Sequence, residues 1–107
     1  MSWKINYSKN AKTDLQDIYE YIAYELFEPQ YAKDQVERIM ASVRKLEDMP
    51  MRFAVYKEEP WKSKGVRFVP VDNYLVFYLP NEDDKCISIV RIMYGGRDIK
   101  KQIVENE

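Results

Sequence analysis

The sequence predicts an α+β fold made of a strand, a two-helix hairpin and a three-stranded antiparallel meander. Three hydrophobic patterns support this. Apolar residues alternate with polar ones over residues 3–7, recur every three or four positions over 11–49, and follow strand-like patterns over 66–93. Helices and strands therefore come in separate runs, which is typical of α+β domains. We expect the helix pair to cover one face of a twisted, mostly antiparallel sheet and to leave the other face for solvent or a partner.

The first strand and the first helix meet at Ser8. Trp3, Ile5 and Tyr7 alternate with polar residues and indicate a half-buried strand. Ser8 is a good N-cap for a helix that starts at Lys9. The apolar positions of this helix form one stripe: Ala11, Leu15, Ile18, Ile22 and Leu26.

A second helix follows a short interruption at residues 27–30, where Pro29 can occupy a first helical turn. Two amphipathic helices joined by so short a link are expected to fold back as an αα-hairpin. A coiled-coil dimer is the alternative, but the repeat lasts only about two to three heptads. The second stripe is Ala32, Val36, Ile39, Val43 and Leu46, extended by Met49 and stopped by Pro50. The residues expected to be buried between the helices and the sheet are Leu15, Ile18, Ile22, Val36, Ile39, Val43 and Leu46.

The second half of the chain predicts strands over residues 66–71, 74–79 and 86–93. The middle segment is apolar on both faces and should be a central strand. Asp72 and Asn73 indicate a turn, and Pro80 is expected to end the central strand.

The segments between and after these strands have weaker patterns. Residues 51–64 have no clear period, and we expect a short strand near 53–56 and then a loop that includes Trp61. A polar loop is expected over 81–85. Gly95 and Gly96 should end the last strand, and residues 99–104 could form a short terminal helix.

Length and composition exclude several classes of protein. The chain has 107 residues, which fits one domain over 1–107, and 17 basic against 18 acidic residues leave a net charge of -1. Such a chain is not held to nucleic acid by bulk charge alone. It has one cysteine, Cys86, and no histidine, so intrachain disulfides, cysteine metal clusters and histidine-based catalysis are excluded. We expect no cofactor and no metal site.

No apolar run reaches the length of a signal peptide or a membrane span. We therefore expect a cytoplasmic protein with no membrane partner.

Two arginines and one strand end are candidate functional positions. Arg67 and Arg91 interrupt apolar strands, where a charge is costly unless it is paired or points out of the core. Tyr94 precedes the two glycines, which let the backbone turn sharply near a partner. A structural role is the alternative for each: Arg67 could be a solvated residue on the open face, and Arg91 could pair with Asp72 or Asp98.

The lysines of the middle segment and the cysteine are weaker candidates. Lys57, Lys62 and Lys64 form a sparse basic loop, partly offset by neighbouring glutamates, so a solvated loop accounts for them. Cys86 is given no role.

The order of the elements and several short segments are similar to one family. The chain resembles toxins of the RelE/ParE superfamily from bacterial type II toxin–antitoxin modules, over nearly its whole length. The resemblance rests on residues 11–18 (AKTDLQDI), Ala32, Leu46, Pro50, Arg67, residues 73–78 (NYLVFY) and residues 90–98 (VRIMYGGRD).

This resemblance implies a growth-arresting toxin with one of two targets. RelE-like members are ribosome-dependent mRNA endoribonucleases, and in that branch Arg67, Arg91 and Tyr94 would be the catalytic residues. ParE-like members poison DNA gyrase without a full catalytic set. The missing histidine and the near-neutral charge favour the ParE-like branch, because RNA cleavage needs a base, an acid and a cation. A non-toxic protein-interaction domain is a third possibility.

The resemblance also implies partners. A cognate antitoxin would neutralise the toxin in a hetero-oligomer, and the target would be gyrase, or the ribosome and mRNA. Basic residues are the candidates for binding target or antitoxin: Lys62, Lys64, Arg97, Lys100 and Lys101. We expect the segment from Arg97 onward to be a functional surface that is mobile or only lightly docked in the free protein.

Overall fold

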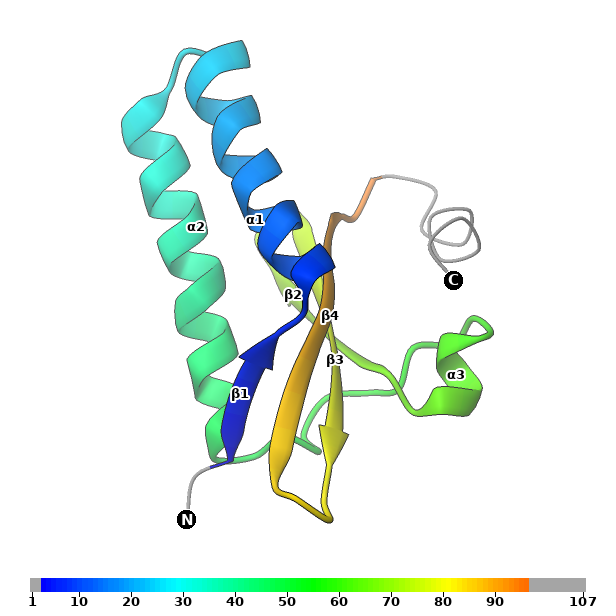
Figure 1. Cartoon of the computed structure of the whole chain (residues 1–107). Helices are drawn as coiled ribbons and strands as arrows, with labels where there is room; N and C mark the ends of the chain where they lie inside the picture. The colour runs from blue at the N-terminus through cyan, green and yellow to red at the C-terminus, as the bar shows by residue number, and fades with distance from the viewer. Residues whose placement is uncertain (1–2, 97–107) are drawn as a thin grey trace.

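A computed structural model describes residues 3–96 and has the predicted α+β architecture (Figure 1). The helical elements lead the strands of the meander along the chain, as the hydrophobic periods require. The elements are β1 (Lys4–Tyr7), α1 (Lys9–Glu20), the π-helical turn η1 (Tyr21–Glu25), α2 (Pro29–Arg44), the 3-10 turn η2 (Lys45–Glu47), α3 (Trp61–Lys64), β2 (Arg67–Val71), β3 (Tyr74–Asn81) and β4 (Cys86–Tyr94). The predicted terminal helix over 99–104 lies outside the described residues.

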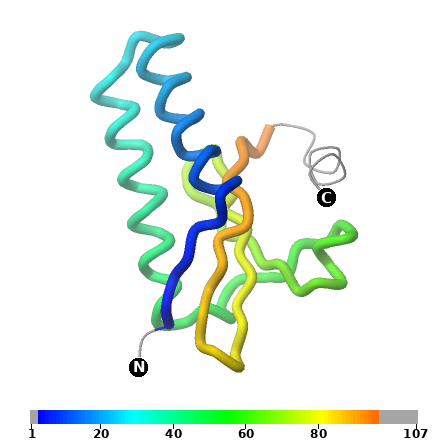
Figure 2. Tube along the Cα trace, viewed as in Figure 1, coloured from blue at the N-terminus to red at the C-terminus, as the bar shows by residue number. Residues whose placement is uncertain are grey.

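The helical hairpin is confirmed. Ser8 caps α1, because its Oγ accepts a hydrogen bond from the N–H of Ala11 at 3.0 Å. The chain turns at Phe27 and Glu28, and α2 then returns beside α1 (Figure 2). Four of the seven residues predicted to be buried are buried: Ile22, Ile39, Val43 and Leu46. The other three, Leu15, Ile18 and Val36, are only partly buried.

The sheet has the order β1-β4-β3-β2. β1 pairs with β4 in parallel, whereas β3 pairs antiparallel with both β4 and β2. The prediction that Pro80 ends the central strand is wrong, since β3 continues to Asn81 with Pro80 opposite Ile87. β2 begins at Arg67 opposite Tyr78, so no residue of β2 lies opposite Pro80, and a residue without an N–H is tolerated at this edge position.

The core has one layer on each face of the sheet. Helix residues such as Ile39, Val43 and Leu46 pack with Tyr78 and Ile89 on the hairpin face. The opposite face was predicted to be left for solvent or a partner. In the structure, residues 56–66 fold over part of this face. There Trp61, Val66, Phe77 and Met93 form a second cluster.

The segment that covers this second face differs from the predicted loop. Trp61 begins the short helix α3, which ends at Gly65 in the left-handed conformation (φ 80°). The Trp61 ring lies 4.5 Å from that of Phe77, centroid to centroid. The predicted strand near 53–56 is reduced to one bridge, between Val55 and Arg67. The conformation of this segment therefore depends on aromatic packing against residues that are distant in the sequence, which local periodicity does not reveal.

Candidate functional site

A groove of about 610 Å³ separates the helical hairpin from the ends of β3 and β4. In Figure 1 the hairpin rises past the upper end of the sheet. The residues that line the groove belong to α1, η1 and α2 on one side and to the neighbouring ends of β3 and β4 on the other. Apolar side chains line it from both sides: Ile18, Ile22 and Leu26 from the hairpin, and Ile92 and Met93 from β4. Such an apolar recess next to polar groups is typical of a binding site.

Tyrosines surround the same groove. Tyr21 and Tyr31 belong to the hairpin, while Tyr74 and Tyr94 belong to the sheet, and their rings meet edge to face at 5.8 Å. Tyr94 is 47% exposed. Tyrosine combines a large apolar ring with a polar tip, which suits a surface that a partner covers.

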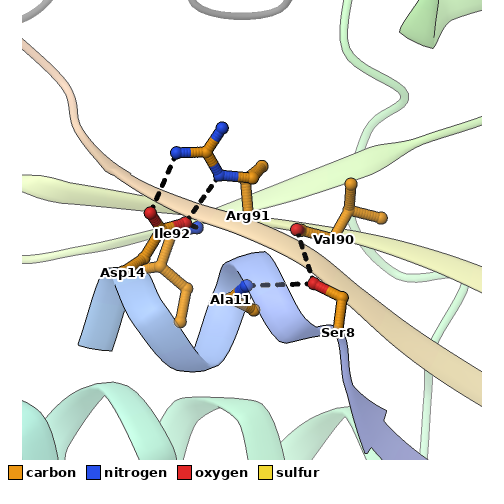
Figure 3. A network of polar contacts seen from close by, with 6 residues as sticks. All are labelled: Ser8, Ala11, Asp14, Val90, Arg91 and Ile92. Carbon is orange, nitrogen blue, oxygen red and sulfur yellow. Dashed lines mark hydrogen bonds and ion pairs between the residues drawn. The ribbon is translucent and has the colours of Figure 1, made fainter. Parts of the chain in front are cut away.

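A buried ion pair closes the inner side of the groove (Figure 3). The Nε and Nη2 atoms of Arg91 donate to the two carboxylate oxygens of Asp14 at 2.7 and 2.9 Å, and the side chains are only 13% and 11% exposed. These hydrogen bonds with Asp14 raise the pKa of Arg91 above its ordinary value. Nη1 of Arg91 is buried and has no hydrogen-bond partner among the residues that the structure describes.

The prediction that Arg91 pairs with Asp72 is therefore wrong. The other predicted partner, Asp98, lies outside the described residues. A register shift in the β3–β4 pairing explains the position of Arg91. Phe77 pairs with Arg91 and Tyr78 with Ile89, so Val90 is an extra residue that bends β4.

Beyond the end of β1, hydrogen bonds from the start of helix α1 and its N-cap cover the outer edge of β4. The N–H and Oγ of Ser8 donate to the carbonyls of Ile89 and Val90, both at 2.9 Å. Further along α1 the Asp14 carboxylate accepts a hydrogen bond from the N–H of Ile92 at 2.9 Å. Figure 3 shows Ser8 and Asp14 beside β4, where Asp14 accepts from the main-chain N–H of Ile92 and from two of the three guanidinium nitrogens of Arg91.

Asp72 has a different function, since it ties α2 to the turn between β2 and β3. Its Oδ2 atom accepts hydrogen bonds from Arg38 Nε at 2.8 Å and Gln35 Nε2 at 2.9 Å. These two bonds, that from Arg38 first, lower the pKa of Asp72 below its ordinary value. Asp72 thereby gives a hydrogen-bond partner to the buried amide group of Gln35, which lines the groove.

The structure does not bring the two candidate arginines together. Arg67 donates through Nη1 to the carbonyls of Phe53 and Met51, at the β2 edge of the sheet. Arg91 lies two strands away on β4 and is held by α1. Arg67 is therefore not a solvated side chain on the open face, as its structural alternative supposed.

The remaining candidates are distributed elsewhere. Lys62 and Lys64 lie on α3, which extends away from the hairpin in Figure 1. Arg97, Lys100 and Lys101 lie outside the described residues. Of the predicted site residues, the groove thus contains Arg91 and Tyr94.

Sequence reasoning missed the tip of the hairpin. We define the tip patch as Tyr21, Tyr24, Leu26, Phe27 and Tyr31, each of which is at least half exposed. A signal was present: residues 13–32 contain five acidic residues and no basic residue. A surface so rich in aromatic and acidic groups is unusual for a solvated turn.

Over the residues described, no three His, Cys, Asp or Glu side chains gather in a way that could hold a metal ion. None of the described helices has the length and apolar character needed to cross a membrane.

Comparison with known proteins gives the family. The model of the ParE toxin of type II toxin–antitoxin systems (parDE) matches residues 5–99. The chain belongs to this ParE toxin family. No curated protein matches it by sequence.

Solved structures agree with the fold of a ParE toxin. The chain is similar to one in the chromosomal ParDE system from P. aeruginosa, with a TM-score of 0.71 and 24% identity, covering 87% of this chain and 96% of that one. A chain of the archaeal RelE–RelB complex from Pyrococcus horikoshii OT3 gives 0.62 and 23%, covering 91% and 99%. A mutant of E. coli toxin RelE in the free state gives 0.67 and 8%, covering 99% and 98%.

Proposed function

We propose that this ParE-family toxin arrests bacterial growth in the cytoplasm by inhibiting DNA gyrase, and that a cognate antitoxin neutralises it in a toxin–antitoxin complex. The family match and the similarity to a ParDE system support this choice of branch.

The observation that carries the proposal is the engagement of both arginines in structural contacts. Ribonuclease chemistry needs cations that converge on the reacting phosphate, together with a general base and acid. Two guanidinium nitrogens of Arg91, Nε and Nη2, donate to the two carboxylate oxygens of Asp14. Arg67 donates to main-chain carbonyls at the β2 edge of the sheet. The chain also has no histidine. This arrangement favours a toxin that acts by binding a protein.

The test compares the two targets with the same purified protein. We expect it to inhibit supercoiling by gyrase or to trap cleaved DNA, and to leave ribosome-bound mRNA intact. Expression without the antitoxin should arrest growth, and co-expression of the short protein encoded next to it should restore growth. mRNA cleavage that is lost in Arg67→Ala or Arg91→Ala would instead make the chain a RelE-like endoribonuclease. Normal growth with soluble, folded protein would indicate a non-toxic interaction domain.

A further inference from the structure

The tip of the helical hairpin exposes large apolar side chains that the fold does not use. All five members of the tip patch are at least half exposed, and Phe27 and Tyr24 reach 81% and 66%. None of the five belongs to the buried clusters or to the partly buried residues that pack on them. Single exposed apolar residues are ordinary, but a group of five at one end of the molecule marks a surface that another molecule covers.

Phe27 occupies a backbone position that usually belongs to glycine. The first helix of the hairpin ends after the π-helical turn η1, where the N–H of Glu28 returns to the carbonyl of Ile22 at 3.0 Å. Helices often end in this way around one residue in the left-handed conformation, most often glycine. Phe27 has this conformation, with a φ of 56°. Its ring adds backbone strain and gains almost nothing from burial, so its contribution is expected in a complex.

The two most exposed rings of the tip patch lie outside the groove. The other three members, Tyr21, Leu26 and Tyr31, are among the residues that line the groove, whereas Tyr24 and Phe27 are not. These two rings are therefore a contact surface that is separate from the groove and larger in exposed fraction than any other part of the patch.

Exposed carboxylates are interleaved with the tip patch along the chain. Residues 13–32 contain five acidic residues and no basic one, and over the residues that the structure describes only Asp14 of the five forms an ion pair. Glu20, Glu25 and Glu28 are exposed. Two copies of this chain that met at their tips would bring like charges together, which opposes self-association. A partner that carries lysine or arginine side chains would instead be attracted.

We propose that the hairpin tip is the surface with which the toxin binds gyrase, through the rings of Tyr24 and Phe27 and the carboxylates around them. The rings fill an apolar recess of the enzyme, and the carboxylates face its lysine or arginine side chains. An enzyme that holds DNA presents such basic surfaces, because it must neutralise phosphates. Aromatic anchors dominate the binding energy of interfaces, and complementary charge supplies specificity. This inference rests on the proposed function, because gyrase is taken as the occupant.

The first test removes the two rings that lie outside the groove. Phe27→Gly places at the left-handed position the residue that tolerates it, so this change is expected to keep or raise the melting temperature. Combined with Tyr24→Gln, it should raise at least about tenfold the toxin concentration that halves supercoiling by purified gyrase holoenzyme. Met49→Ser is the matched control, since Met49 is 60% exposed outside the tip patch, and it should inhibit like wild type.

The second test reverses charge. Glu20→Lys combined with Glu25→Lys should weaken binding of the toxin to immobilised gyrase holoenzyme, and the loss should shrink as salt is raised, because screening reduces the electrostatic attraction. Basic residues near the end of a helix are favourable, so the fold should be kept. Glu82→Lys combined with Asp83→Lys, in the turn between β3 and β4, makes the same change in charge and should leave binding unchanged.

The outcomes separate this inference from the proposed function. Loss of gyrase binding and inhibition in the two tip variants, with melting temperatures like that of wild type and with both controls active, is the expected result. Wild-type toxin that neither binds nor inhibits gyrase would remove the proposed function and this inference together. Wild-type inhibition that both tip variants keep would overturn the inference alone. The two variants change different groups, so if one of them fails to fold, the other still decides the result.

Discussion

The two ends of the helical hairpin have the same periodicity and opposite surroundings. At its root, Ile39, Val43 and Leu46 are at most 1% exposed against the sheet. At its tip, Leu26 continues the stripe of α1 and is 50% exposed, because the sheet does not extend that far. Hydrophobic spacing thus predicts which side of a helix is apolar, while burial depends on what lies opposite.

Asp14 lies between the root and the tip of the hairpin, and its substitution should lower the stability of the protein more than any other change considered below. Asp14→Ala would leave the guanidinium of Arg91 without its carboxylate and the N–H of Ile92 without an acceptor. We expect a loss of about 3–5 kcal/mol in the free energy of unfolding, measured by urea denaturation. If the double variant Asp14→Leu/Arg91→Met is as unstable as the single one, the cost does not come from the uncompensated charge.

A matched pair of truncations compares the two ends directly. Ile39→Ala at the root should lower the free energy of unfolding by about 2–5 kcal/mol, because the side chain is fully buried. Leu26→Ala at the tip should change it by less than about 0.5 kcal/mol. Equal losses in the two variants would show that the tip is packed in solution and would contradict the comparison.

The smallest expected effect concerns the contact between α2 and the turn at Asp72. Its pKa is lowered in the folded state, so its contribution to stability is present above the unfolded pKa and is lost as the pH falls through the folded value. Asp72→Asn should therefore be less stable than wild type near neutral pH, and the two should converge on acidification. The difference should be small, since Asp72 and Arg38 are 42% and 48% exposed. Thermal unfolding of both proteins across pH measures it.

The sequence predicted the parts of the fold that depend on local patterns. The cap at Ser8, the hairpin and the three later strands follow from spacing and turn residues. The structure of residues 56–66 could not be predicted this way, because α3 is held by the contact of Trp61 with Phe77 across the chain.

The candidate site was predicted less well. The partner of Arg91 is 77 residues away in sequence, and a β-bulge determines its direction. The contact of Asp14 with the outer edge of β4 at Ile92 depends on β1 ending opposite Ile89, and composition does not reveal that. The acidic, aromatic character of the tip was visible in residues 13–32, but only the structure places it beside a groove.

The position of β4 between β1 and β3 has a consequence for how the protein is made. β1 comes first among the described strands, yet the strand it pairs with, β4, comes last among them. Contacts between such distant segments slow folding, because a long loop must close before they form. A nascent chain that stops before residue 86 has neither a partner for β1 nor the second neighbour of β3, and the carboxylate of Asp14 has no strand to hold. The growing polypeptide therefore gains all four strands of the described sheet only after β4 has been made, and shorter products should lack the groove that β4 helps to line.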